Sequence, residues 1–306
     1  MYNKSSMLTE FILKGIPHAD YLCLPLFVFF SLIYIFTLMG NILLIVAVKE
    51  TPALHTPMYF FLTNLSFLDL LFSSVTLPKL LGTFLLDKTI SFTGCVCQLY
   101  FFHFFGSCEC FLYTIMAYDR YVAICRPLYY ARLMSWRICM SFACGCWLTG
   151  SLHSMTHTIL TFSLHYCGCN EIDNFFCDIT PVLKLACADT TVNKAVTLAN
   201  IGAIALLCFI LILTSYVHIL IAIMKKKTVD ARRKTFSTCV SHLIVVLLFY
   251  VPCVFIYMQP YSGSALGRTV PIFQTLFTPL LNPIVYSLRN KQVKEVLKKI
   301  GRGISL

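Results

Sequence analysis

The chain has 306 residues, of which 58% are hydrophobic and only 12% are charged, and its mean hydropathy is +0.79. Soluble domains are much less apolar, so this composition excludes a soluble protein and indicates an integral membrane protein. The formal net charge of +11 agrees with attraction to anionic membrane lipid and requires no nucleic-acid partner.

Seven apolar runs are each long enough to cross a bilayer as a helix, which takes about 20 residues. They cover residues 23–48, 58–80, 92–124, 138–160, 196–224, 239–259 and 270–288. The sequence therefore predicts an all-α membrane protein with a seven-helix bundle at 23–289, a tail at 1–22 and a short final segment at 290–306.

Lysine and arginine are concentrated in alternate connecting segments, and an excess of these residues marks the cytoplasmic side. Most of the 24 cations lie inside if the N-terminus lies outside, so we expect an extracellular N-terminus. Asn3-Lys4-Ser5 is then a glycosylation sequon on the outer side. No cleaved signal peptide is evident, and we expect the first span to act as a signal anchor.

The final segment has helical periodicity. Val293, Val296, Leu297 and Ile300 recur at i, i+3, i+4 and i+7, with lysines between them. This spacing predicts a short amphipathic eighth helix, held in the inner interface by its apolar face and by attraction of its lysines to anionic lipid.

Two acidic residues interrupt the apolar runs, Asp69 in the second and Glu109 in the third. Ionisable side chains are costly inside a membrane and mark functional sites by default. Two carboxyl groups could share a proton or hold a sodium ion through oxygen ligands, and the sequence leaves both options open.

An adjacent acid and base, Asp119 and Arg120, stand where the third run ends, within Met-Ala-Tyr-Asp-Arg-Tyr-Val-Ala-Ile-Cys at 116–125. A stop-transfer flank would explain the cation but not the acid beside it, nor Tyr118 and Tyr121 on either side. Arginine offers five donors in a fixed geometry, so Arg120 can exchange one set of partners for another. We interpret the pair as a switch, with a static boundary pair as the alternative.

Six of the 16 cysteines stand near the expected outer face: Cys95, Cys97, Cys167, Cys169, Cys177 and Cys187. Six thiols allow many pairings, and their spacing does not choose among them. The other cysteines are expected to serve mainly as small apolar packing residues.

Several motifs occur in the spans and in the order typical of one receptor class. They are Gly40-Asn41, Asp69 in the second span, Asp119-Arg120-Tyr121, Trp147 and Asn282-Pro283-Ile284-Val285-Tyr286. This set resembles the rhodopsin-like G-protein-coupled receptors.

Finer motifs narrow the resemblance. They are Pro57-Met58-Tyr59-Phe60-Phe61-Leu62, the whole 116–125 stretch, Lys234-Thr235-Phe236-Ser237-Thr238-Cys239, Pro279-Leu280-Leu281 before Asn282, and Tyr250 where most receptors of the class have Trp. With these motifs the chain looks like the vertebrate odorant receptors.

The resemblance implies two disulfides, Cys95–Cys177 and Cys167–Cys187, and leaves a third bond between Cys97 and Cys169 open. It also implies that Asp69 and Glu109 face each other near Asn41 and Asn282. The implied coupling switch comprises Asp119, Arg120, Tyr121, Tyr216, Tyr250, Asn282, Pro283 and Tyr286. In this switch Tyr216 and Tyr286 receive Arg120 when the inner end opens to a G-protein helix.

Helical spacing groups small and polar side chains on single faces of the third, fifth and sixth runs. Interhelical packing explains such faces as well as ligand contact does, but the resemblance favours contact. The expected ligand-binding residues are Phe102, His103, Gly106, Ser107, Cys110, Thr197, Asn200, Ile204, Cys253, Val254, Tyr257 and Thr275. His153 and His157, at i and i+4 in the fourth run, could join them.

These residues make few charges available, so we expect a small, mostly apolar volatile odorant as the ligand. The resemblance implies coupling to a heterotrimeric G protein of the stimulatory or olfactory type, in the plasma membrane of olfactory cilia. A transporter or channel is the alternative, although the two halves of the chain do not resemble each other. No catalytic motif is present, so we expect no enzyme, no firm metal site and no cofactor beyond a possible sodium ion.

Overall fold

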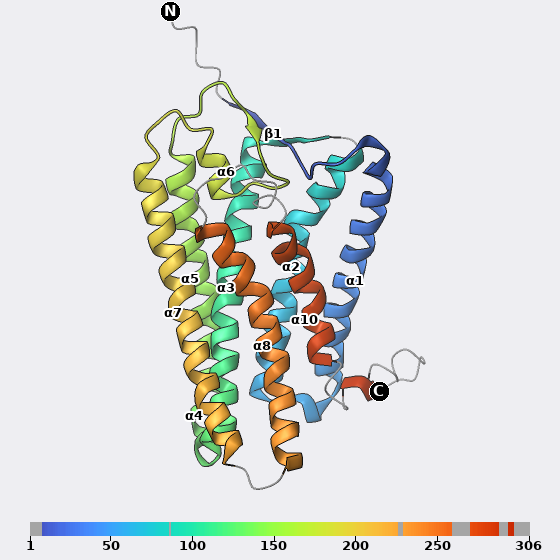
Figure 1. Cartoon of the computed structure of the whole chain (residues 1–306), viewed down its shortest axis with the longest axis vertical. Helices are drawn as coiled ribbons and strands as arrows, with labels where there is room; N and C mark the ends of the chain where they lie inside the picture. Colours follow the sequence, from blue (N-terminus) through green and yellow to red (C-terminus); the bar gives the residue numbers. More distant parts are fainter. Residues whose placement is uncertain (1–7, 86, 226–228, 259–269, 288–292, 297–306) are drawn as a thin grey trace, which may run out of the picture.

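The computed structural model describes residues 8–85, 87–225, 229–258, 270–287 and 293–296 (Figure 1). Within the helix at 229–258, the side chains of residues 229–231, 233–238, 241 and 255–258 are outside the description. The described part is a bundle of long helices lying side by side, with strand β1 and a long loop over one end.

The long helices are α1 (Cys23–Glu50), α2 (Pro57–Leu85), α3 (Phe92–Cys125), α5 (Trp136–Phe162), α7 (Thr191–Met224) and α8 (Val229–Met258). The last span starts at Val270, passes through the π-helical segment η4 (Phe273–Phe277) and continues as α10 (Thr278–Ser287). The short helices are η1 (Asp20–Leu22), η2 (Pro52–Leu54), η3 (Pro127–Tyr129), α4 (Tyr130–Leu133) and α6 (Ile179–Leu183). Each predicted apolar run coincides with one long segment, apart from residues 259 and 288, which lie outside the described part.

Within the described residues, four helices are long and apolar enough to cross a membrane by length and composition: Asp20–Glu50, α2, α3 and α7. The apolar part of α8 is a shorter stretch, His242–Val254. Helix α5 is long, but its imidazole and hydroxyl side chains, such as His153 and Ser154, make it more polar. Leucine, isoleucine and phenylalanine side chains remain exposed along α1 and α7, as expected for helices surrounded by lipid.

Helix α3 occupies the centre of the bundle, where it packs against α2, α5, α7 and α8. It approaches α5 closely at Gly150, where a Cβ atom would lie 2.7 Å from Cys108 Sγ and 3.2 Å from the Phe104 carbonyl oxygen. Small residues allow such close contact between membrane helices. The position of α3 places each of its ends among the neighbouring helices, so residues along it can contact most of the bundle.

A small sheet covers the outer end of the bundle, which the prediction of an all-α chain with a simple tail did not include. Strand β1 (Glu10–Leu13) pairs antiparallel with β2 (Thr89–Ser91) and parallel with β3 (Glu171–Ile172). Phe11 and Leu13 are fully buried, because alternate side chains of a strand point to the same face. The tail is therefore part of the fold from Glu10 onward.

Two disulfides secure the outer loop to the bundle and to itself. Cys95 at the start of α3 is bonded to Cys177, and Cys167 is bonded to Cys187, which confirms both implied pairings. Cys97 and Cys169 are exposed free thiols, so the third bond that the sequence left open is not formed.

Residues 293–296 form a helical turn in which Val293 and Val296 are buried, and Val293 packs into the main core. Leu297 and Ile300 of the predicted eighth helix lie outside the described residues, as does the sequon at Asn3. The amphipathic helix and the glycan therefore stay predictions.

Candidate functional site

A narrow cavity lies among α3, α5, α7, α8 and η4. Its lining residues are Phe102, His103, Gly106, Ser107, Cys110, His153, Ile201, Ile204, Ala205, Phe249, Cys253 and Gln274. The centres of water-sized molecules can occupy about 50 Å³ of it. One water needs roughly 10–15 Å³ by this measure, so the cavity has room for a few waters or a very small molecule.

The expected ligand-binding residues of α3 all line this cavity, and Ile204 of α7 and Cys253 of α8 join them. His153 of α5 does so as well, whereas His157, one turn further along α5, does not. The structure therefore brings together seven of the twelve expected residues.

On α7 the lining residues are Ile201, Ile204 and Ala205, whereas Thr197 and Asn200 are not among them. The Thr197 hydroxyl is buried and donates to the Asn193 carbonyl oxygen at 2.8 Å, within its own helix. Helical spacing identified the correct face of α7, but the cavity does not extend to its first turns.

Val254 on α8 was expected to contact the ligand, but it does not line the cavity. Its side chain is 51% exposed, on the same outer side of the helix as Val251, while Cys253 and Phe249 face inward. Pro252 lies between these residues and removes a backbone donor from the helix. The side chain of Tyr257 lies outside the described residues.

In the last span Gln274 lines the cavity in place of the expected Thr275. Thr275 is fully buried, and its hydroxyl donates to the Pro271 carbonyl oxygen at 2.9 Å. Both residues lie in the π-helical segment η4, whose turns are wider than those of an α-helix. Gln274 was missed because the sequence showed no periodic polar face in this span.

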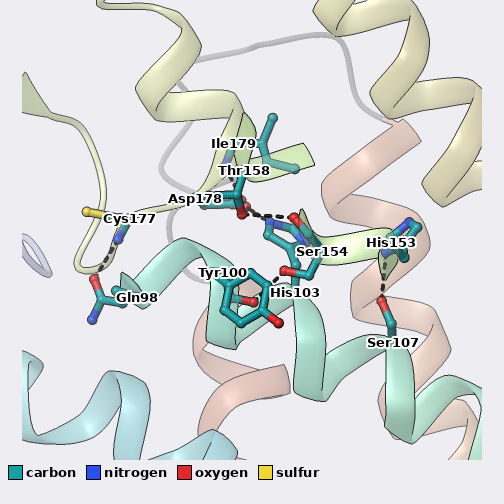
Figure 2. A network of polar contacts seen from close by, with 10 residues as sticks. All are labelled: Gln98, Tyr100, His103, Ser107, His153, Ser154, Thr158, Cys177, Asp178 and Ile179. Carbon is teal, nitrogen blue, oxygen red and sulfur yellow. Dashed lines mark hydrogen bonds and ion pairs between the residues drawn. The ribbon is translucent and has the colours of Figure 1, made fainter. Parts of the chain in front are cut away.

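A buried polar network joins the outer loop to the cavity wall (Figure 2). The Nε2 atom of His103 on α3 lies 3.0 Å from Asp178 Oδ1, and both side chains are buried. The same Asp178 oxygen accepts the Ile179 backbone N–H at the start of α6. In the neighbouring contact, Gln98 Oε1 accepts the backbone N–H of Cys177 at 2.9 Å. The loop is thus fixed over the cavity by hydrogen bonds as well as by its disulfide.

His153 contacts α3 through a different residue. Its Nδ1 atom lies 2.9 Å from Ser107 Oγ, and Figure 2 shows the two side chains facing each other between α5 and α3. Its Nε2 atom is buried and has no hydrogen-bond partner among the described residues.

Tyr250 of α8 is one contact away from the cavity. Its hydroxyl lies 3.0 Å from the sulfur of Cys110, which lines the cavity from α3. Its ring also packs against Phe209 of α7. Tyr250 therefore links three helices directly beside the cavity.

In the middle of the bundle, Asp69 and Glu109 are both buried and lie close enough for their carboxyl groups to interact. Asn282 Nδ2 donates to both oxygens of Asp69 at 3.0 Å, and Tyr113 contacts Asn282. Asn41 donates instead to the backbone carbonyls of Thr37 and Pro279. Pro283, next to Asn282, packs against α1, since a Cβ on Gly40 would lie 3.1 Å from its ring.

At the inner end of α3, Arg120 is ion-paired with Asp119 at 3.1 Å. Tyr130 of α4 donates its hydroxyl to the other Asp119 oxygen at 2.8 Å. Burial and the neighbouring Asp119 raise the pKa of Tyr130, so this tyrosine remains a protonated donor. Tyr130 was not predicted, because no spacing rule connects the loop residue with Asp119.

The other expected members of the switch lie close by. The hydroxyl of Tyr216 on α7 lies 2.5 Å from His242 Nδ1 on α8, and the Tyr286 hydroxyl is buried without a hydrogen-bond partner among the described residues. Tyr121 packs against His218 of α7. The arrangement is a closed inner end in which Arg120 is held by its neighbouring acid.

Comparison with known proteins identifies the family of this chain. A sequence model described as "Olfactory receptor" matches residues 30–302. The chain is 53% identical to olfactory receptor 10G7 of Homo sapiens over 303 residues, which are 98% of this chain and 97% of that protein. The chain belongs to the olfactory receptor family.

Other olfactory receptors give the same result. Olfactory receptor 10G4 of Homo sapiens is 54% identical over 300 residues, covering 97% of this chain and 96% of that protein. Olfactory receptor 10D3 of Mus musculus is 52% identical over 299 residues, with the same two shares.

Membership of the olfactory receptor family makes the chain a multi-pass membrane protein that senses odorants and couples to a G protein. Its relatives are receptors and not enzymes, which agrees with the absence of a catalytic motif in the sequence. The long segments α1, α2, α3, α5, α7, α8 and η4–α10 are the helices of this seven-span receptor.

Proposed function

We propose that this olfactory receptor binds a small, mostly apolar volatile molecule in the cavity among α3, α5, α7, α8 and η4. We further propose that binding activates a heterotrimeric G protein of the stimulatory or olfactory type. The observation that carries the proposal is the lining of the cavity, in which aromatic and aliphatic side chains surround a few polar groups. Pockets of this kind hold small ligands by apolar contact and orient them with one or two hydrogen bonds.

The small volume of the cavity and the loop above it favour a small ligand. His103 is bonded to Asp178 of that loop, so a ligand that displaces His103 also disturbs the loop. A ligand larger than a few water molecules must displace side chains, and the displaced side chains then report binding to their neighbours.

Tyr250 provides the step from ligand to switch. A ligand that displaces Cys110 or Phe249 disturbs the contact of Cys110 with the Tyr250 hydroxyl and allows α8 to move away from α3. At the inner end, this movement separates Tyr216 from His242 and leaves Tyr216 and Tyr286 available to Arg120. A G-protein helix can then enter between α3 and α8.

Asp69 and Glu109 supply a second influence on this equilibrium. One oxygen of Glu109 and the side-chain oxygen of Asn41 are buried without hydrogen-bond partners among the described residues. A sodium ion held by such oxygens, or a proton shared by the two carboxyl groups, would stabilise the closed bundle and be released on opening.

The proposed location is the plasma membrane of olfactory cilia, with the N-terminus outside and a glycan at Asn3. The function is tested by measuring cyclic AMP in cells that carry the receptor together with the stimulatory or olfactory G protein. We expect an odorant-dependent rise that vanishes when the G protein is deleted. A transporter or channel would instead move a substrate across the membrane with or without the G protein.

A further inference from the structure

The two imidazole side chains in the cavity wall have different surroundings. The Nε2 atom of His103 is bonded to Asp178 Oδ1, at 3.0 Å. His153 is 9% exposed, and only its Nδ1 atom is hydrogen-bonded, to Ser107 at 2.9 Å. Its buried Nε2 atom has no partner among the described residues, and an unsatisfied buried polar atom is costly. His153 thus lines the ligand cavity and has a buried Nε2 atom without a hydrogen-bond partner among the described residues.

Two neutral tautomers of His153 are compatible with the contact to Ser107, and they place the ring hydrogen on different nitrogen atoms. A hydroxyl group has one hydrogen to donate, and the His153 Nδ1 atom is the only described hydrogen-bond partner of the Ser107 side chain. If the hydroxyl donates to Nδ1, the neutral ring carries its hydrogen at Nε2. Nε2–H is then a donor that requires an acceptor atom.

We propose that His153 anchors the ligand by donating from Nε2–H to an acceptor oxygen, such as the carbonyl oxygen of an aldehyde, ketone or ester. The apolar body of the ligand then lies against Ile201, Ile204 and Phe249 on the other walls. This inference rests on the proposed function and deepens it by naming the ligand class and the residue that selects it.

The remaining polar groups of the cavity do not make this selection. Gln274 contributes an amide, which offers both donors and an acceptor and so accepts carbonyl and hydroxyl ligands alike. His157 lies one turn from His153, with ring centroids 4.7 Å apart, but it does not line the cavity. His157 is therefore a matched control, because it has the same side chain on the same helix and a buried Nε2 atom that likewise has no partner among the described residues, but it does not line the cavity.

The test measures cyclic AMP in cells that carry the receptor, with probes that differ only at the oxygen. Two such sets are acetophenone, 1-phenylethanol and ethylbenzene, and cyclohexanone, cyclohexanol and methylcyclohexane. The variants are His153→Leu, which removes the donor, His153→Gln, whose amide nitrogen can reach the place of Nε2, and His157→Leu. All responses are normalised to surface expression.

We expect the ketone to be the most potent member of a set. His153→Leu should raise its half-maximal concentration by about fivefold to tenfold, the loss that one hydrogen bond causes. His153→Gln should restore most of this loss, and His157→Leu should leave the ketone response unchanged. All variants should give the same cyclic AMP response to the hydrocarbon, since it forms no hydrogen bond with His153.

Three results would overturn the anchor while leaving the proposed function in place. The first is equal potency of the ketone and the hydrocarbon. The second is a ketone response that His153→Leu does not change. The third is activation by the alcohol but not by the ketone, which would make the ligand the hydrogen-bond donor. A receptor that reaches the surface but is silent to both sets and to a broader set of small volatiles would overturn the proposed function itself.

Discussion

Asp119 is held from two sides at the inner end of α3, by Arg120 at 3.1 Å and by Tyr130 at 2.8 Å. The motif at 116–125 predicted the first contact, whereas the second became visible only in the fold. Both contacts keep the carboxylate satisfied in the closed receptor, so each of them opposes the release of Arg120.

Tyr130→Phe removes the hydroxyl and leaves the ring in place. A hydrogen bond to a charged group contributes about 1.5–3 kcal/mol, part of which is regained from water at this half-buried site. We expect basal cyclic AMP to rise severalfold at equal surface expression. Tyr129→Phe is the control, because Tyr129 is 54% exposed and makes no such contact. Equal basal activity in the two variants would contradict the role given to Tyr130.

Arg120→Ala removes the group that the switch releases. We expect odorant-dependent cyclic AMP to be lost while the receptor still reaches the cell surface, because Asp119 keeps its hydrogen bond from Tyr130 when the Arg120 side chain is removed. Flow cytometry of the surface epitope, run beside the cyclic AMP assay, separates the two effects. Loss of surface expression alone would show that Arg120 is a structural residue.

Helices α3 and α5 approach each other closely at Gly150. Gly150→Ala would place a Cβ atom 2.7 Å from the Cys108 sulfur and 3.2 Å from a backbone oxygen, so the helices must separate. We expect lower surface expression and a thermal unfolding temperature lower by several degrees in detergent. Gly145→Ala, on the same helix with nothing within 4 Å of its Cβ, should behave as the unchanged receptor. Equal stability of both variants would show that this contact is adaptable.

For the last span, the sequence predicted the helix but not which of its side chains lines the cavity. Hydropathy located the span, and the motif at Asn282 located its inner half. No helical face was identified in this span, so Thr275 was expected at the cavity where the fold places Gln274, within the π-helical segment η4. Val254 was assigned from helical spacing, which defines a face only to within about one residue.

For the whole molecule, composition predicted the class, which membership of the family confirms, and the disulfides implied by resemblance are present. The orientation indicated by the charges stays a prediction. The outer sheet was missed because β1 is only four residues long and its partners are distant in sequence. Short strands with distant partners leave no periodic signal beyond Phe11 and Leu13 on one face.

The sheet predicts a role for the tail in the stability of the receptor. Phe11→Ser exposes the buried face of β1 and removes a side chain that packs against Phe92 and Tyr166. We expect a loss of about 3 kcal/mol or more in stability, as for other large core truncations, and reduced surface expression. Glu10→Ser, at an exposed position of the same strand, is the control. Normal expression of Phe11→Ser would show that the sheet is dispensable.

A ligand in the cavity beside α3 is proposed to drive the switch at the inner end of this helix. Gly106 lines this cavity, and a Cβ atom there meets only the Phe72 ring, at 3.7 Å, so Gly106→Val adds bulk to the cavity wall with no backbone contact at its Cβ atom. The direct measurement is the odorant concentration–response curve for cyclic AMP, normalised to surface expression, beside Gly202→Val, whose Cβ meets nothing within 4 Å. We expect Gly106→Val to lose the response and Gly202→Val to keep it, whereas a Gly106→Val response superimposable on that of the unchanged receptor would show that this cavity does not drive the switch.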